Sequence, residues 1–248
     1  MGGTLLNVIT VAIGSAIGLL VGNRLSEKIQ QSVITGLGLV TLFVGLSNAG
    51  QTGNVIIPLI SLVTGAILGE LLNIDLALER FGGWLQTRFG SKSSADNDSQ
   101  NERARFINGF VTASLVFCIG PLTFVGSIQD GMGLALGFQQ LAIKSVLDGF
   151  AAMAFASSLG LGVAFSIVTV LLLQGGLALA GSVLGNFMST PMINEMTAVG
   201  GLLLMGLALV LLDVKKPRIA NFLPALVIAP LLVAIATALN IPVYPQIP

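Results

Sequence analysis

The sequence predicts an all-α fold, a polytopic bundle of about eight transmembrane helices. Three observations predict it. Of the 248 residues, 54% are hydrophobic and only 9% are charged, whereas water-soluble domains carry about 25% charged residues. The mean hydropathy is +0.94. The apolar residues also gather in runs long enough to cross a bilayer as a helix, about 20 residues. Together these observations exclude a water-soluble domain and make the lipid bilayer the solvent of the chain.

The apolar runs give the expected spans in chain order. Short connections separate most of them, and one longer polar segment separates the third span from the fourth. The amino terminus, from Met1 to Thr4, lacks the basic region of a signal peptide, so we expect the first span to be retained. The expected spans are 5–22, 32–49, 54–72, 107–129, 142–159, 162–183, 197–213 and 220–240.

The basic residues predict the orientation, because cytoplasmic loops carry an excess of Lys and Arg. If the amino terminus lies outside, ten of the eleven basic residues fall in cytoplasmic segments, and only Lys144 does not. We therefore expect a multi-pass protein of the bacterial inner membrane with both termini outside. The formal net charge is zero, so charge gives no argument for nucleic acid as a partner.

The polar segment after the third span begins as an amphipathic helix, with apolar residues spaced by three or four and Trp84 among them. Such a helix lies in the plane of the lipid headgroups. The stretch 91–101 is too polar to bury anything, so we expect a flexible linker there. The segment tethers two membrane halves or, alternatively, docks a regulatory partner. The spaced apolar positions are Ile74, Leu78, Phe81, Leu85 and Phe89.

The first three spans resemble the last three. The run 34–38 matches 197–201, and a run around Pro58 matches one around Pro224. Each span of the first set lies five spans before its match in the last set. Successive spans cross the membrane in opposite directions, so an offset of five makes matching spans antiparallel, and the sequence predicts an inverted repeat. The alternative is chance similarity between glycine-rich helices. The predicted organisation is 1–72 for the first three spans, 73–106 for the cytoplasmic insert, 107–160 for a central two-helix hairpin and 161–248 for the last three spans.

Glycine recurs at every fourth position in two spans, at Gly14, Gly18 and Gly22 in the first and at Gly65 and Gly69 in the third. Small residues at this spacing let helix backbones touch, which replaces the hydrophobic drive that lipid cannot supply. The sequence favours packing within the chain. The alternative is a homo-oligomer formed through these glycine-rich helix faces.

Ionisable groups inside a span cost about 3 kcal/mol each at mid-span and mark functional sites. Lys144 and Asp148 in the fifth span are spaced i, i+4, so they share one helix face and can form an ion pair. In the functional interpretation Asp148 accepts a proton or cation and Lys144 tunes it. In the alternative, the pair is structural and Lys144 reaches outward. If the carboxylate titrates during turnover, Asp148→Asn should abolish transport without loss of folding.

Pro121 interrupts the fourth span, because a proline in mid-helix removes a hydrogen bond and clashes with a carbonyl of the preceding turn. We expect a kink or break there, with carbonyls near Phe117 freed to coordinate a cation or a polar solute. Thr112, Ser114 and Asp130 extend this candidate pathway along the same span. The alternative is a kink that serves only packing.

The residue types exclude several kinds of site. Histidine is absent, and the single cysteine, Cys118, has no partner, so the sequence offers neither a disulfide nor a common zinc or redox site. No metalloprotease, Ser-His-Asp, P-loop or dinucleotide-binding motif occurs. We therefore expect no metal, no cofactor and no enzymatic activity.

The runs 109–118, 144–149, 193–201 and 221–225 resemble those of the bacterial YdfK/YqgA-type membrane proteins. The resemblance covers nearly the whole chain. The family is grouped under a domain of unknown function, so the resemblance implies a polytopic inner-membrane protein and no particular substrate. It also directs attention to the broken fourth span, the fifth-span ion pair and the start of the seventh span.

The function that the sequence predicts is transport of an ion or small solute, with a site between the repeats and the hairpin. The rivals are an ion channel lined by the broken fourth span, and a membrane scaffold or accessory subunit in which the repeat is architecture alone. The candidate binding residues are Asp148, Lys144, Asp130, Asn194, Glu195, Thr112, Ser114 and Pro121.

Overall fold

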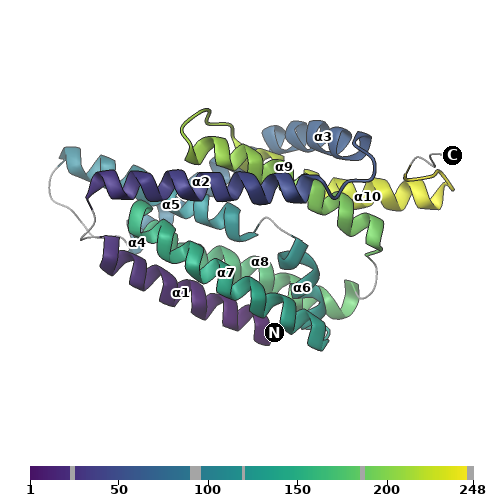
Figure 1. Ribbon diagram of the computed structural model, residues 1–248, viewed down its shortest axis with the longest axis horizontal. Helices are drawn as coiled ribbons and strands as arrows, with labels where there is room; N and C mark the ends of the chain where they lie inside the picture. The colour runs from purple at the N-terminus through teal and green to yellow at the C-terminus, as the bar shows by residue number, and fades with distance from the viewer. Residues whose placement is uncertain (23–25, 90–95, 119–120, 185–187, 245–248) are drawn as a thin grey trace. The chain divides into compact units, whose positions relative to one another are not determined.

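The structure is a computed structural model that describes residues 1–22, 26–89, 96–118, 121–184 and 188–244. Within these ranges all regular structure is helical, and no strand occurs (Figure 1). The all-α prediction is confirmed. The elements are α1 (Gly2–Gly22), α2 (Glu27–Ala49), α3 (Ile56–Leu72), α4 (Ile74–Phe89), α5 (Asp96–Cys118), α6 (Pro121–Gly131), α7 (Ala135–Leu159), α8 (Gly162–Leu184), α9 (Thr190–Leu211), the short 3₁₀ helix η2 (Ile219–Phe222) and α10 (Ala225–Ala238).

Several of these helices are long and apolar enough to cross a bilayer. Among the described residues six qualify, and a seventh is counted if α3 and the first part of α4, which meet at a bend of 50°, form one span. The expected fourth span corresponds to α5 and α6 together, which are separate helices. The bundle of membrane helices is therefore as predicted, while the number eight and the repeat stay predictions.

The chain forms two compact units whose segments alternate along the sequence, and each is described by itself. Unit 1 consists of Met1–Leu37, Leu76–Cys118 and Leu122–Leu184. Unit 2 consists of Gly38–Asp75, Ile119–Pro121 and Gly185–Pro248.

In unit 1, α1 and α7 lie side by side along a ridge of glycines (Figure 1). A Cβ atom added to Gly14 or Gly18 would overlap the carbonyl oxygen of Gly149 or Met153 respectively. The numbering rises in the same sense on both helices, so α1 and α7 run parallel. The prediction that these glycines pack within the chain is confirmed, and they give no support to a homo-oligomer formed through the same face.

Helix α4 has the bounds that the amphipathic pattern predicts, and it packs on α5. Leu85 forms a buried cluster with Phe106 and Phe110, against which Leu78 and Phe81 also pack. Trp84 is exposed and stacks on Phe81. The apolar face of α4 is thus covered at least in part by protein.

The flexible linker predicted at 91–101 is partly wrong. Residues 96–101 belong to the first turns of α5, and 91–95 lie outside the described residues. Composition alone suggested disorder, but this stretch is continuous with a long helix. The helix that continues to Cys118 can also be extended residue by residue at little cost once it has formed.

The predicted break in the fourth span is present. Helix α5 ends at Cys118 and α6 begins at Pro121, a position where proline costs little because the first helical residues have no partner for their N–H groups. The hydroxyl of Thr123 donates a hydrogen bond of 3.1 Å to the carbonyl of Phe117. This carbonyl, which we expected to be free for a solute, therefore has a partner within unit 1.

In unit 2, α10 packs against both α9 and α3, and glycine contacts show that α2 runs antiparallel to α9 and α3 antiparallel to α10. In the first pair, Gly45 meets the backbone of Gly201, and Gly38 meets Leu212 beyond the end of α9. In the second pair, a Cβ atom at Gly65 would crowd Ala225, and one at Gly69 would overlap the backbone of Asn221. Both third-span glycines therefore also pack within the chain.

Candidate functional site

The ion pair predicted in the fifth span exists in unit 1. Nζ of Lys144 contacts Oδ2 of Asp148 one turn further along α7. Both residues are buried, with exposed fractions of 6% and 7%. The detail that Lys144 reaches outward is wrong, because the ammonium lies inside the protein against its partner. An ion pair lowers the cost of burying both charges.

Asn7 of α1 completes this cluster, and we call these three side chains the paired site. Its amide Nδ2 donates a hydrogen bond of 3.0 Å to Oδ2 of Asp148. Asn7 is completely buried, and its Oδ1 has no hydrogen-bond partner in the described structure. One carboxylate oxygen thus receives both donors, from two helices whose contact is made by the glycine ridge. The site has no formal net charge, and it offers an ammonium, a carboxylate and a spare amide oxygen.

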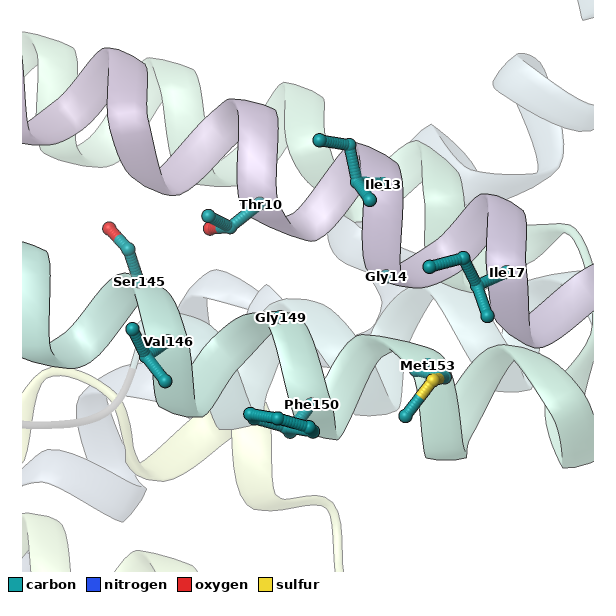
Figure 2. A pocket seen from close by; sticks show the side chains of 9 residues that line it. All are labelled: Thr10, Ile13, Gly14, Ile17, Ser145, Val146, Gly149, Phe150 and Met153. Carbon is teal, nitrogen blue, oxygen red and sulfur yellow. The ribbon is translucent and has the colours of Figure 1, made fainter.

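A shallow groove runs along the same helix pair, with Gly14 and Gly149 at its floor (Figure 2). Its volume is about 270 Å³. The hydroxyls of Thr10 and Ser145 lie at one end, but each donates to a backbone carbonyl, of Asn7 and Leu141 respectively. The groove is therefore apolar in effect, and neither charged residue of the paired site lines it. Its lining residues are Thr10, Ile13, Gly14, Ile17, Ser145, Val146, Gly149, Phe150 and Met153.

Asp130 lies at the end of α6 and caps the start of α1. Its Oδ2 accepts hydrogen bonds from the backbone N–H groups of Gly3, at 3.1 Å, and Thr4, at 3.5 Å. It also lies 3.1 Å from the amino group of Met1. A carboxylate at a helix N-terminus is stabilised by the dipole and by the unpaired N–H groups. In this structure Asp130 therefore holds α1 in place.

Glu195 lies near the start of α9 in unit 2, and it is completely buried. Its Oε2 accepts a hydrogen bond of 2.7 Å from the hydroxyl of Thr52, and its Oε1 accepts one of 3.0 Å from the backbone N–H of Gly53. Tyr244 is next to it. We call Glu195, Thr52, Gly53 and Tyr244 the unpaired site, because no described cation contacts the carboxylate.

The remaining predicted residues occupy other places. Thr112 donates to Oδ1 of Asn108 on its own helix, and Ser114 hydrogen-bonds to Thr169 across the contact of α5 with α8, at 3.0 Å. Pro121 begins α6. Asn194 precedes Glu195 on α9 and is half-buried. The predicted set is thus divided among several places, and only Lys144 and Asp148 form a direct pair.

Several polar residues in these sites were not predicted from the sequence, although neutral residues such as Thr112, Ser114 and Asn194 were. Asn7 is an amide in an otherwise apolar span, and that signal could have identified it. Gln174, completely buried near the middle of α8 with no hydrogen-bond partner in the described structure, carries the same signal. Thr52 and Tyr244 lie in connecting segments, where no sequence pattern points to Glu195.

The long apolar helices define the class of protein, a helical membrane protein with several spans. More particularly, the chain belongs to the family described as "Protein of unknown function (DUF554)", which matches residues 2–234. It is 27% identical over 245 residues to "Uncharacterized membrane protein YdfK" of Bacillus subtilis (strain 168), covering 97% of this chain and 99% of that relative. It is 30% identical over 238 residues to "Uncharacterized protein YqgA" of Escherichia coli (strain K12), covering 95% and 97%. No solved structure matches the chain.

Proposed function

We propose that this protein transports an ion or small solute across the bacterial inner membrane, and that the solute binds at the paired site. The observation that carries the proposal is the buried ion pair of Lys144 and Asp148, joined to α1 through Asn7. Charged residues are costly inside a membrane protein, and they mark solute and ion pathways. Apolar residues of similar volume often stabilise a core as well as a buried ion pair does.

The chemistry of the paired site suits exchange. A solute that carries a cationic group can replace Lys144 at the carboxylate, and one that carries an anionic group can replace Asp148 at the ammonium. A singly charged solute leaves the displaced group without a counter-charge, so a zwitterionic solute, which pairs with both groups at once, suits this low-dielectric site best. The spare Oδ1 of Asn7 offers a further acceptor without any rearrangement of the pair.

A reciprocal contact in unit 2 supports the inverted repeat on which alternating access would depend. The sequence match pairs Gly38 with Gly201. Gly38 packs against Leu212, and Gly201 packs against Ala49. The sequence match that pairs Gly38 with Gly201 also pairs Ala49 with Leu212, because the two residues of each copy are equally far apart in sequence. Replacing each residue by its match in the other copy therefore turns one contact into the other. This is expected for helices related by a two-fold axis in the membrane plane.

Contacts in unit 2 join helix ends that the predicted topology places on the same side of the membrane. In unit 2, Glu70 pairs with Arg218 at 3.0 Å, and both are expected to be cytoplasmic. At the other ends of these helices, Glu195 binds Thr52, and both are expected outside. These contacts support the predicted alternation of the helices across the membrane, and the proposal that both termini lie outside rests on the distribution of Lys and Arg.

The test begins with purified protein and a thermal-shift panel of monovalent cations, carboxylates, amines and amino acids, each added alone. A bound compound raises the melting temperature by mass action. Compounds that do so are then assayed for saturable uptake into proteoliposomes. A linear, non-saturating flux would indicate a channel. A stable protein partner in gentle detergent extracts, with no flux, would indicate a scaffold.

A charge swap separates transport from structure. The variant Lys144→Asp/Asp148→Lys keeps an ion pair, so it should fold, but we expect it to lose at least about tenfold of the uptake because the carboxylate is displaced. The matched control swaps an exposed pair of similar spacing, in the variant Asp213→Lys/Lys216→Asp. Full uptake by the first variant would reduce the buried pair to a structural role. If it fails to fold, Lys144→Gln/Asp148→Asn takes its place.

A further inference from the structure

Glu195 differs from the other two buried carboxylates of the described chain. Asp148 has the ammonium of Lys144, and Asp130 has backbone donors at a helix N-terminus. Glu195 has a hydroxyl and a single backbone N–H, both neutral, although it is completely buried. An ionised carboxylate without a cation is among the most expensive groups to bury.

No described cation of unit 2 is placed to compensate it. Glu195 is bonded to the 50–55 connection, which is joined through Asn54 to the carbonyl of Val243, and its own helix α9 packs against α3 and α10. The only titratable group that these described elements present to it is Tyr244. The other charged side chains described in unit 2 lie toward the opposite ends of α3 and α9; they are Glu70, Asp75, Asp213, Lys215, Lys216 and Arg218.

Tyr244 closes the unpaired site from the carboxyl-terminal side. Its ring is so close to Gly53 that a Cβ atom there would overlap it. Burial, and then the negative charge of Glu195, raise the pKa of the Tyr244 hydroxyl above its ordinary value, so the phenol stays protonated near neutral pH. Its buried oxygen lies beside Asn194 and Glu195 but makes no hydrogen bond of good geometry. The site therefore contains a spare polar group and no cation.

We propose that Glu195 is a proton-binding site, and that the proton is the ion whose gradient drives the transport proposed above. In the bound state a proton from water forms an O–H bond at Oε2, and the carboxyl group changes from a charge of −1 to neutral. No other covalent bond changes, and no redox partner is needed.

The hydrogen-bond geometry accommodates both states. In the ionised state Thr52 donates its hydroxyl proton to Oε2, while its oxygen accepts from the N–H of Asn54 at 3.1 Å. When Oε2 carries the proton, the Thr52 oxygen can accept it through its second lone pair. The bond from Gly53 to Oε1 is kept, because that oxygen remains an acceptor. A hydroxyl that donates or accepts as required suits a proton better than a metal ion.

Protonation also has a mechanical consequence within unit 2. Hydrogen bonds to an ionised carboxylate are about twice as strong as those between neutral groups. Neutral Glu195 therefore holds the 50–55 connection less firmly, and this connection joins α2 to α3. Proton binding would thus loosen α9 from the connection, at the ends of the helices that we expect to lie outside.

The single tyrosine of the chain makes the test specific, because Tyr244 is the only source of a tyrosine signal. The full chain, labelled with ring-¹³C tyrosine in lipid nanodiscs, is titrated from about pH 4 to about pH 9, which spans ordinary and raised carboxyl titrations. We expect the ring resonance to shift with pH in the wild type and to lose that shift in Glu195→Gln. The matched control, Asp213→Asn, changes an exposed carboxylate of the same unit and should keep the shift.

Several outcomes would overturn the proposal. An unchanged wild-type resonance across the titration would show that Glu195 takes up no proton. A shift that persists in Glu195→Gln would assign the titration to another group. A shift that follows sodium at constant pH, with choline as the control salt, would make the ligand sodium. If Glu195→Gln does not fold, infrared difference spectra of the wild type must show a carboxylic acid C=O band on acidification, and its absence would count against the proposal.

This inference concerns the role of Glu195 in transport and rests on the proposed function, but the proton site can stand without it. If Tyr244 reports a titration at Glu195 while the charge swap at Lys144 and Asp148 leaves uptake intact, the proton site holds and the solute site falls. If uptake depends on the paired site but Tyr244 reports no titration, the solute site holds and the proton site falls.

Discussion

The two units of the chain bury a carboxylate in two different settings. In unit 1, Asp148 contacts the ammonium of Lys144 and the amide of Asn7. In unit 2, Glu195 has only a hydroxyl and a backbone N–H. A paired charge can be released only when something replaces its partner, whereas an unpaired carboxylate can be neutralised by one proton. This difference is why we propose a solute for the paired site and a proton for the unpaired site.

The largest effect is expected when one charge is removed at each site. Asp148→Leu leaves Lys144 buried without a partner, so we expect a loss of about 3–5 kcal/mol in the free energy of unfolding. Glu195→Gln preserves shape and hydrogen bonding and removes an uncompensated charge, so we expect a change of about 1 kcal/mol or less. Reversible unfolding in mixed detergent micelles measures both.

A rescue variant serves as the control for the first effect. Lys144→Met combined with Asp148→Leu removes both charges and should recover most of the lost stability. Equal losses for Asp148→Leu and Glu195→Gln would mean that the two sites do not differ as described.

A bulkier side chain in the glycine ridge should separate α1 from α7 without changing any charge. Gly14→Val places methyl groups against the backbone of Gly149, so α1 must shift from α7. We expect a loss of about 1–3 kcal/mol from overpacking, together with weaker retention of any ligand of the paired site. The control is Gly36→Ala, since no atom lies within 4 Å of the new Cβ. A harmless Gly14→Val would contradict the parallel packing of α1 and α7.

A smaller effect is expected from Thr52→Val, which removes the hydroxyl that donates to Glu195. The carboxylate then loses one of its two donors, and we expect the free energy of unfolding to fall by about 1–2 kcal/mol. The control, Thr35→Val, removes an exposed hydroxyl that bonds only to its own helix. Equal effects of the two substitutions would show that the hydrogen bond to Glu195 contributes nothing in particular.

The smallest effect is expected at the exposed pair of Lys216 and Asp213, whose charged atoms lie 3.0 Å apart in water. Lys216→Ala should change the free energy of unfolding by no more than about 0.5 kcal/mol, because exposed ion pairs are screened. The same unfolding assay, at low and high salt, checks it. A larger loss would mean that the exposed pair contributes to stability as the buried pair of Lys144 and Asp148 does.

Local patterns in the sequence predicted those features that depend on one helix. The spacing of Lys144 and Asp148 placed them on one face, Pro121 marked the break between α5 and α6, and the apolar positions of α4 gave its bounds. Each of these follows from helix geometry or from the covalent structure of proline.

Features that depend on two distant segments could not be read in this way. Asn7 reaches Asp148 only because α1 packs parallel to α7, a contact between residues 141 positions apart. Thr123 donates to the carbonyl of Phe117 across the boundary between two helices, a contact that no local sequence pattern indicates. The contact of Thr52 with Glu195 likewise depends on the fold of unit 2, and nothing in either local sequence indicates it.

The parallel contact of α1 with α7 also constrains how the protein is made. Ribosomes add about 5–20 residues per second, so α1 leaves the ribosome on the order of ten seconds before its partner does. Throughout that interval the amide of Asn7 and the exposed backbone of the glycine ridge must remain among lipids or insertion factors. Biogenesis of this protein therefore includes a waiting period, during which its first helix is most vulnerable to degradation or to misassembly with other nascent chains.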